Sequence, residues 1–164
     1  MLNTKYQFPY SILLFAGCII LPLIIGVIGA LFTTPGIPIW YASLNKPWFN
    51  PPNWLFGPVW TVLYILMGLS LWLVIKNGFS EASVRMASYI FSAQLIMNLL
   101  WSVVFFGVHS PAGGMIIIII LIALIIATIL AFEKICRLSA YLMIPYLCWT
   151  LFAGILNAYI AILN

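Results

Sequence analysis

Five apolar stretches divide this chain of 164 residues, and their length limits what it can fold into. The stretches are residues 12–32, 54–75, 86–108, 115–132 and 138–163. A bilayer core of about 30 Å takes roughly 20 helical residues, so each stretch is long enough, or nearly so, to cross it. Six basic and two acidic side chains are too few to build a water-soluble surface. The sequence therefore predicts an all-α integral membrane protein, a five-transmembrane-helix bundle that forms a single domain over residues 1–164.

The connections between the stretches differ in length. The first, residues 33–53, is long and is predicted to be a loop, whereas the later ones are short and carry turn-forming or charged residues. The third and fourth stretches are predicted to form a hairpin through Pro111. The first stretch is longer than the apolar region of a typical signal peptide, so a retained helix is favoured over a cleaved leader.

The basic residues predict the orientation. With alternating spans, one side of the membrane receives Lys5, Lys76, Arg85, Lys134 and Arg137. The other side receives only Lys46, and positive residues in short loops mark the cytoplasmic side. The N-terminus is therefore predicted to be cytoplasmic, with the C-terminus and the first loop outside. Basic residues this few and dispersed give no indication of a nucleic-acid partner.

Metal and disulfide chemistry is not indicated. Cys18, Cys136 and Cys148 are isolated and lack ligand spacing, so they are interpreted as small hydrophobic residues. The only histidine, His109, stands in a tight turn and is interpreted as a solvated turn residue in preference to a haem ligand.

Tryptophan and proline are concentrated between Trp40 and Tyr64, where the chain reads WYASLNKPWFNPPNWLFGPVWTVLY. Proline stiffens an irregular segment, and tryptophan offers a flat face with a single N–H donor. An aromatic belt at the membrane interface would explain scattered tryptophans. It explains less well the closely spaced pairs Lys46-Pro47 and Pro51-Pro52, so a more specific role is predicted for this segment.

Three stretches carry polar and aromatic side chains at helical spacing. On the second these are Gly57, Trp60 or Thr61, Tyr64 and Gly68; on the third, Gln94, Asn98, Trp101 and Phe105; on the fifth, Tyr146, Trp149, Ala153 and Asn157. An amide that faces lipid leaves its polar atoms unpaired, so Gln94, Asn98 and Asn157 are expected to point into the bundle. Each amide either joins helices or contacts a ligand. The fourth stretch has almost no polar residue and is predicted to face lipid throughout.

These faces together predict an internal cavity with the first loop over its mouth. Its predicted walls are Tyr64, Trp60, Trp101, Phe105, Tyr146 and Trp149. Such a cavity suits a flat, largely apolar molecule with a few polar edges. The alternative is that the aromatic side chains simply fill the core of the bundle.

The tryptophan- and proline-rich segment resembles the signature of the TspO/MBR family, the translocator protein / tryptophan-rich sensory protein family. The matching positions are Trp40, Tyr41, Leu44, Lys46, Pro47, Pro51, Pro52, Phe56, Val59, Trp60, Leu63 and Tyr64. The third stretch matches at Gln94, Leu95, Asn98, Trp101, Phe105, Phe106 and Gly107, and the fifth at Pro145, Tyr146, Trp149, Phe152, Ala153, Leu156 and Asn157. The resemblance therefore runs in order along most of the chain.

The resemblance implies a five-helix membrane protein, often a homodimer, that binds porphyrins and related tetrapyrroles under the first loop and requires no cofactor. By motif position, the ligand-binding residues are Tyr41, Trp60, Asn98, Trp101, Trp149 and Ala153. The residues that support the loop are Trp40, Lys46, Pro47, Pro51 and Pro52. Animal members follow a tyrosine near the end of the fifth helix with a basic residue. Here no Lys or Arg follows Tyr159, which disfavours sterol recognition by that motif and favours a bacterial cell membrane.

Three functions stay open at this point. The first is a receptor or sensor for porphyrins. The second is a light- and oxygen-dependent porphyrin-degrading enzyme, with Trp60 and Trp149 as electron donors. The third is a passive transporter of tetrapyrroles or sterols. The apolar stretches contain no Asp, Glu, Lys or Arg, which argues against acid–base catalysis and against an ion-coupled pump. An enzyme is therefore less favoured than a receptor.

Overall fold

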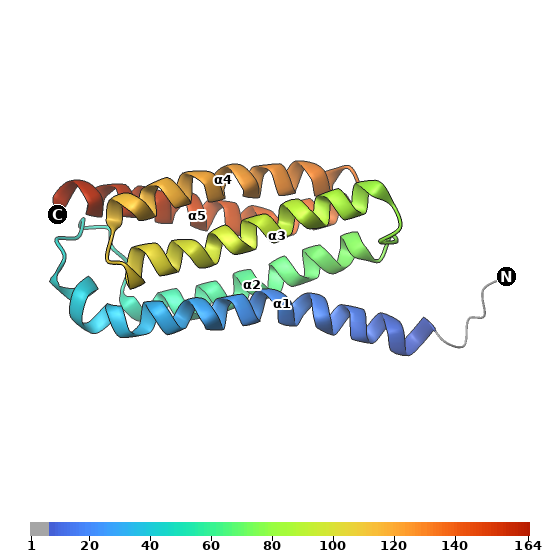
Figure 1. The fold of residues 1–164 in the computed structure, drawn as a ribbon, viewed down its shortest axis with the longest axis horizontal. Coiled ribbons are helices and arrows are strands. Elements are labelled where there is room, and N and C mark those ends of the chain that lie inside the picture. The colour runs from blue at the N-terminus through green and yellow to red at the C-terminus, as the bar shows by residue number, and fades with distance from the viewer. Residues whose placement is uncertain (1–6) are drawn as a thin grey trace.

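The computed structural model describes residues 7–164, with side chains from Ser11 onward, as a bundle of long helices (Figure 1). The helices are α1 (Gln7–Gly36), α2 (Asn53–Ile75), α3 (Ala82–Ser102), α4 (Pro111–Glu133) and α5 (Arg137–Leu163). Within the described residues, five helical segments are long and apolar enough to cross a membrane. The predicted all-α, five-transmembrane-helix bundle is confirmed.

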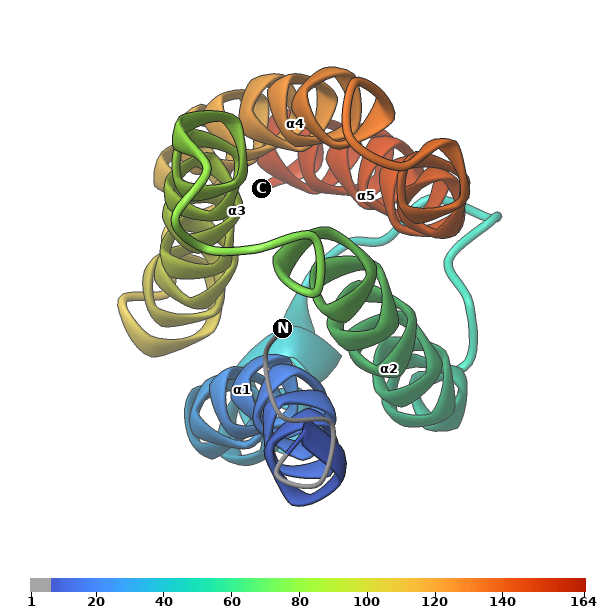
Figure 2. The ribbon, with the colours of Figure 1, turned by 90° about the vertical axis from the view of Figure 1, so that its right-hand side faces the viewer.

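Seen along its length, the bundle is a closed ring of helices (Figure 2). In ring order, α1 packs against α2, α2 against α5, α5 against α4, α4 against α3, and α3 against α1. The N-terminal part of α1 diverges from the other helices (Figure 1). Because the ring brings α1, α2, α3 and α5 around one interior, these four helices can enclose a common space.

The first helix continues beyond its predicted end. In place of a loop over residues 33–53, α1 runs to Gly36 and is followed by one wide π-helical turn, η2 (Ile37–Tyr41). Ala42 and Ser43 are still helical, and the first loop is therefore residues 44–52. The predicted loop includes Pro35 and Pro38, but helices in lipid tolerate proline, and a local π turn rearranges the backbone hydrogen bonds next to them. The Ala42 N–H accordingly donates to the Ile37 carbonyl, five residues back.

Two other helices, α3 and α4, begin before their predicted first residues, for reasons of charge and capping. The α4 helix begins at Pro111, before the predicted residue 115, because Ser110 Oγ accepts the Gly113 N–H at 3.1 Å and proline suits the first helical position. The α3 helix begins at Ala82, before the predicted residue 86. The Arg85 guanidinium donates to the Ser80 carbonyl, so the charge marks the end of the apolar span but not of the helix.

The prediction that the fourth helix faces lipid throughout is wrong. One face of α4 is buried against α3 and α5, through Gly114, Ile118, Leu121, Ile125, Thr128 and Phe132. These positions follow helical spacing. The sequence concealed this face because isoleucine and leucine occupy both the buried and the lipid-exposed sides of the helix.

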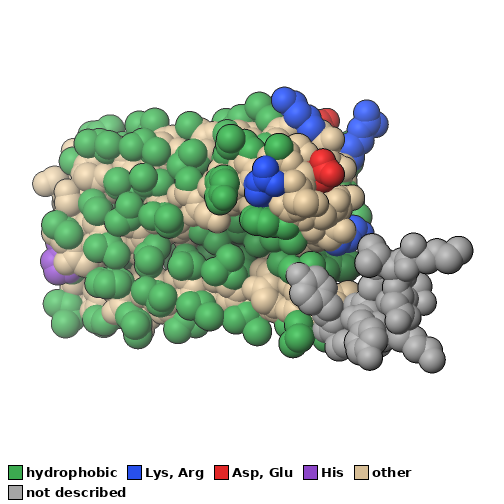
Figure 3. Space-filling model, turned by 45° about the vertical axis from the view of Figure 1, so that its right-hand side comes forward, with side chains coloured by type: hydrophobic (Ala, Val, Ile, Leu, Met, Phe, Trp, Pro, Cys, Tyr) green, Lys and Arg blue, Asp and Glu red, His purple; other side chains and the backbone are tan. Residues whose placement is uncertain are grey.

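Charged side chains gather at one end of the bundle, and apolar side chains cover its length (Figure 3). Lys76 and Lys134 lie in the connections at that end, and Arg85 and Arg137 lie in the first turns of α3 and α5. Lys46 lies in the first loop at the other end. Lys5, the remaining basic residue of the orientation prediction, falls outside the described residues. The distribution agrees with the basis of that prediction, and the side of the membrane stays a prediction.

The orientation is tested by placing single cysteines at the two ends, in a background with Cys18, Cys136 and Cys148 changed to alanine. We expect a membrane-impermeant maleimide to label Trp48→Cys in intact cells, because Trp48 is 95% exposed in the first loop. The matched control, Lys134→Cys, should react only after the membrane is permeabilised. Labelling in the opposite order would reverse the topology.

Candidate functional site

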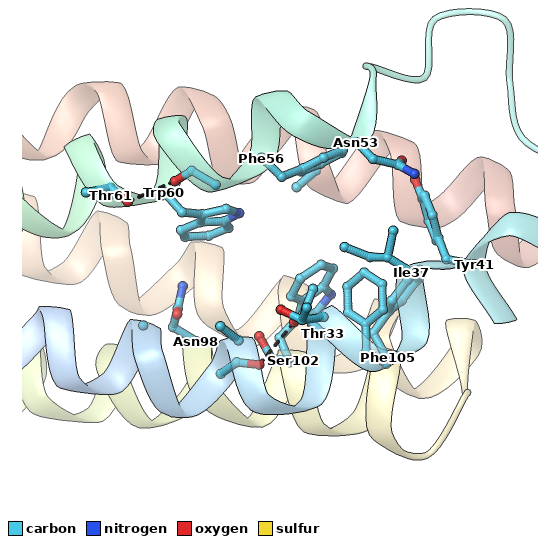
Figure 4. Close-up of a pocket in the computed structure, with 18 of the residues that line it drawn as sticks. Thr33, Ile37, Tyr41, Asn53, Phe56, Trp60, Thr61, Asn98, Ser102 and Phe105 are labelled. Carbon is cyan, nitrogen blue, oxygen red and sulfur yellow. Dashed lines mark hydrogen bonds between the residues drawn. The ribbon is translucent and has the colours of Figure 1, made fainter. Parts of the chain in front are cut away.

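A cavity of about 480 Å³ lies between α1, α2, α3 and α5, in the half of the bundle next to the first loop (Figure 4). All six side chains that the sequence analysis assigned to ligand binding line it: Tyr41, Trp60, Asn98, Trp101, Trp149 and Ala153. The structure thus brings these residues to one space. Its size is within the range of small-molecule sites, about 300–1,000 Å³.

A hydrogen-bonded chain of side chains forms the floor of the cavity. Tyr64 Oη donates to Asn98 Oδ1 at 2.7 Å, and Asn98 Nδ2 donates to Tyr146 Oη at 3.0 Å. Tyr146 Oη in turn donates to Gln94 Oε1 at 2.9 Å. Because these residues come from α2, α3 and α5, the chain joins three helices below the cavity.

Two of the predicted polar and aromatic residues lie behind the cavity wall. Tyr146, predicted to be a wall residue, is fully buried and does not line the cavity, because the chain of hydrogen bonds draws its hydroxyl toward α3. Gln94 is also fully buried, and its Nε2 lies 3.9 Å from the sulfur of Met67. Gln94 is therefore an interhelical contact, one of the two roles that the sequence left open.

Asn157 connects two walls of the cavity. Its Oδ1 accepts the Trp101 Nε1–H at 3.1 Å, and its Nδ2 donates to the Pro111 carbonyl at 2.7 Å. The amide therefore ties α5 to α3 and to the start of α4. The Trp101 ring also stacks on Phe105, with ring centroids 5.1 Å apart. Trp101 accordingly presents ring carbon to the cavity, while its N–H is used within the protein.

Besides Trp101 and the exposed Trp54, the wall contains the indoles of Trp60 and Trp149. Trp60 stacks on Tyr64, with ring centroids 5.6 Å apart, and Trp149 packs edge-on against Phe56. The Nε1–H of Trp149 is buried and has no hydrogen-bond partner among the described residues. A buried donor without a partner is unfavourable, so a ligand acceptor that reached this N–H would stabilise it.

The first loop is held at the end of η2 by Lys46. Its Nζ donates to the carbonyls of Tyr41 at 2.7 Å, Leu44 at 2.8 Å and Ala42 at 3.2 Å. The Tyr41 hydroxyl donates to Asn50 Oδ1 at 2.6 Å. The lysine therefore caps backbone groups that would otherwise lie unpaired at the helix end, and the tyrosine secures the far side of the loop.

The remaining loop-support residues lie around the cavity and do not line it. Pro47 is buried, and its carbonyl accepts the Asn50 N–H at 3.0 Å in a tight turn. The Pro51 carbonyl accepts from the Asn50 side chain, and Pro52 leads directly into α2. Trp40 packs edge-on against Phe105, with ring centroids 5.4 Å apart. These residues fix the backbone above the cavity.

Trp40 also reaches His109, which was predicted to be a solvated turn residue. His109 is exposed and has a positive φ of 58°, as a tight turn requires. Its ring stacks on that of Trp40, with centroids 4.6 Å apart and planes inclined by 17°. The histidine thus joins the α3–α4 turn to η2.

Sequence reasoning missed a clasp between the loop and the last helix. Asn45 N–H donates to Asn164 Oδ1 at 2.9 Å, and Asn164 Nδ2 donates back to the Asn45 carbonyl at 3.0 Å. The two residues are 119 positions apart. Nothing in the local sequence of either asparagine indicates the other.

The wall contributed by α1 was also missed. Its residues are mostly small or aliphatic: Leu23, Gly26, Val27, Gly29, Ala30, Thr33, Thr34 and Ile37. The run of small residues at helical spacing was the available indication, since such residues allow helices to approach closely. No aromatic or amide side chain marked this face of the helix.

Comparison with known proteins gives a consistent result. The sequence profile of the TspO/MBR family matches residues 18–163. The chain is 43% identical over 154 residues to the tryptophan-rich protein TspO of Chlorobaculum tepidum, covering 94% of this chain and 98% of that one. It is 44% identical over 154 residues to the TspO of Archaeoglobus fulgidus, covering 94% and 99%. It is 36% identical over 144 residues to the translocator protein of Bos taurus, covering 86% and 84%.

Proposed function

The chain belongs to the TspO/MBR family, and from the geometry of its cavity we propose that it is a membrane receptor for porphyrins and related flat, hydrophobic molecules. Family membership supports a membrane sensor or transporter role. The choice of ligand and of receptor function is the proposal.

The shape and chemistry of the walls support a flat aromatic ligand. Trp60, Trp101 and Trp149 present indole rings to one cavity, and Tyr41 and Phe105 add further ring surface. Aromatic walls favour stacked or edge-on contacts with a planar ring system. A porphyrin is a planar, rigid ring system and can make such contacts with several wall residues at once.

The unpaired Trp149 Nε1–H is the observation that carries the proposal. It is a buried donor without a partner, on a residue of a largely apolar wall. A porphyrin offers acceptors at its carboxylates and at its unprotonated ring nitrogens. The ligand would therefore give this N–H the partner that the protein does not supply.

We expect protoporphyrin to quench tryptophan fluorescence saturably, with a Kd in the micromolar range, or about −8 kcal/mol. The measurement is a titration of protein purified in detergent. Trp60→Phe combined with Trp149→Phe should remove most of the quenching and weaken binding, because both indoles line the cavity.

The matched control for this titration is Trp72→Phe. Trp72 packs against Phe15 and under Lys76 and does not line the cavity, so its loss should leave the Kd unchanged. Quenching that rises linearly with porphyrin, or a Kd that is equal in all three proteins, would rule out the proposed site.

Light-dependent porphyrin degradation is a second candidate, favoured by the position of Trp60 and Trp149. Indole is the most easily oxidised of the abundant aromatic side chains, and both indoles line the cavity. Loss of bound porphyrin absorbance under illumination, in the presence of oxygen, would distinguish an enzyme from a receptor. Flux of porphyrin into sealed vesicles would distinguish a transporter from both.

A further inference from the structure

Along one side, the cavity is bordered by residues that also lie on the surface of the bundle. On α1 these are Val27, Ala30 and Thr34, and on α2 they are Asn53, Trp54, Gly57 and Thr61; all seven line the cavity and all are exposed. The Val27 side chain, for example, is 64% exposed. The cavity therefore reaches the surface between α1 and α2, which lie on opposite sides of it in Figure 4. We call this opening the α1–α2 slot.

Apart from Trp54, the borders of the slot are made of small and medium-sized side chains. A Cβ atom added at Gly57 would meet no atom within 4 Å, so space is open there. The Thr61 hydroxyl donates to the Gly57 carbonyl at 2.9 Å, and the residue therefore needs no water or lipid headgroup to pair it. Asn53 to Thr61 corresponds to about 12 Å of helix, long enough to pass a flat molecule edge-on.

Below the slot, α1 and α2 are in close contact. The Tyr64 ring occupies the position that a side chain at Gly26 would need. Deeper still, a Cβ atom at Gly68 would lie 2.7 Å from the Cys18 carbonyl oxygen. The slot is therefore closed at its inner end and open over the part of the spans nearest the first loop. Because α1 and α2 are membrane-spanning helices, acyl chains would surround most of this opening.

The first loop, next to the cavity, is by contrast fastened by several hydrogen bonds. Lys46 Nζ donates hydrogen bonds to three backbone carbonyls, and the Tyr41 hydroxyl donates to Asn50 Oδ1. Asn45 and Asn164 are joined by two further hydrogen bonds. Opening the loop requires these hydrogen bonds to break, whereas passage through the slot breaks none of them.

We propose that the ligand reaches the cavity sideways from the bilayer, through the α1–α2 slot, with the first loop remaining closed. This rests on the proposed function for the identity of the ligand. The slot restricts the substrate class to flat amphiphiles that dissolve in the membrane before they bind. A water-soluble molecule of the same shape, unable to partition into acyl chains, is excluded by the route.

The test measures how fast a membrane-dissolved thiol reagent reaches the cavity. Ala153→Cys places a single thiol on the cavity wall, in a background with Cys18, Cys136 and Cys148 changed to alanine and the protein in liposomes. The reagent is pyrenyl maleimide, which partitions into lipid. Gly57→Phe, which fills the slot from α2, is expected to slow labelling at least tenfold, and Ala30→Phe, which fills it from α1, should do the same.

Two controls accompany the blocking variants. Gly17→Phe makes the same substitution at an exposed glycine of α1 with nothing within 4 Å and no place in the cavity wall, and should leave the rate unchanged. Asn164→Ala releases the loop clasp and should also leave it unchanged. If neither Gly57→Phe nor Ala30→Phe slows labelling, the proposal is overturned. If Asn164→Ala raises the labelling rate, the reagent enters under the first loop.

Porphyrin uptake from the same liposomes completes the experiment. If porphyrin binds, its association rate should fall with Gly57→Phe by the same factor as the labelling rate. If porphyrin does not bind to the unmodified protein, the proposed function fails, while the labelling rates still decide whether the slot is the route.

Discussion

Gly68→Ala is expected to destabilise the protein by more than about 3 kcal/mol, which corresponds to a fall of roughly 6–12 °C in the thermal midpoint. The added Cβ would lie 2.7 Å from both the Cys18 carbonyl oxygen and the Ile19 Cα. Both are backbone atoms of α1, so no change of side-chain rotamer can relieve the contact. The helices must separate, and the apolar contacts along their interface are lost with them.

The matched control is Gly57→Ala on the same helix. That position has no atom within 4 Å of the added Cβ, so the midpoint should stay within about 2 °C or rise slightly, since alanine is the better helix former. The two midpoints are measured in the same detergent by the same unfolding assay. Equal midpoints for both variants would mean that α1 is free to move away from α2 at no cost, and the close approach would not be a constraint on the fold.

The fold was predictable because it depends on a property that every residue of a span shares. Length and apolar composition are sufficient to place five spans, and apart from Val108 the apolar stretches lie within the helical segments of the structure. The helix ends depend on individual residues. The first helix was predicted to stop at residue 32, before Pro35 and Pro38, yet Pro35 lies within α1 and Pro38 within the π turn η2.

The candidate cavity was predictable where its wall contrasts with lipid. Trp60, Asn98 and Trp149 are conspicuous on helices that are otherwise aliphatic, and all three line the cavity. The helical spacing that predicted these residues does not show that Tyr146, three residues before Trp149, lies behind the cavity wall. Tyr146 and Trp149 are about one helical turn apart. Tyr146 lies behind the wall because its hydroxyl is hydrogen-bonded to Asn98 on α3.

Features made by ordinary residues could not be predicted. The α1 wall consists of glycine, alanine, threonine and aliphatic side chains, which any membrane helix contains. The buried face of α4 is set by its neighbours, since isoleucine fits either side equally. The clasp between Asn45 and Asn164 joins residues 119 positions apart and depends on where α5 ends in space relative to the loop.

Asn98→Leu is the second large effect, and it decides between the two roles that the sequence allowed for this residue. Both polar atoms of the amide are occupied, by the hydroxyls of Tyr64 and Tyr146. Removing the amide leaves the Tyr64 hydroxyl with no acceptor in a buried setting, at a cost of about 1–3 kcal/mol. We therefore expect the thermal midpoint to fall, while porphyrin affinity in the folded fraction stays within about threefold of the unmodified protein.

The double variant Tyr64→Phe with Asn98→Leu is the control for this interpretation. Removing both partners leaves no unpaired hydroxyl at Tyr64, so the double variant should be more stable than the sum of the two single losses predicts. Tyr146 retains Gln94 as its acceptor in every variant, which keeps the rest of the chain of hydrogen bonds comparable. The opposite result, an unchanged midpoint with binding at least tenfold weaker, would make Asn98 a ligand contact in spite of its two tyrosine partners, and the floor of the cavity would then have to rearrange when the ligand binds.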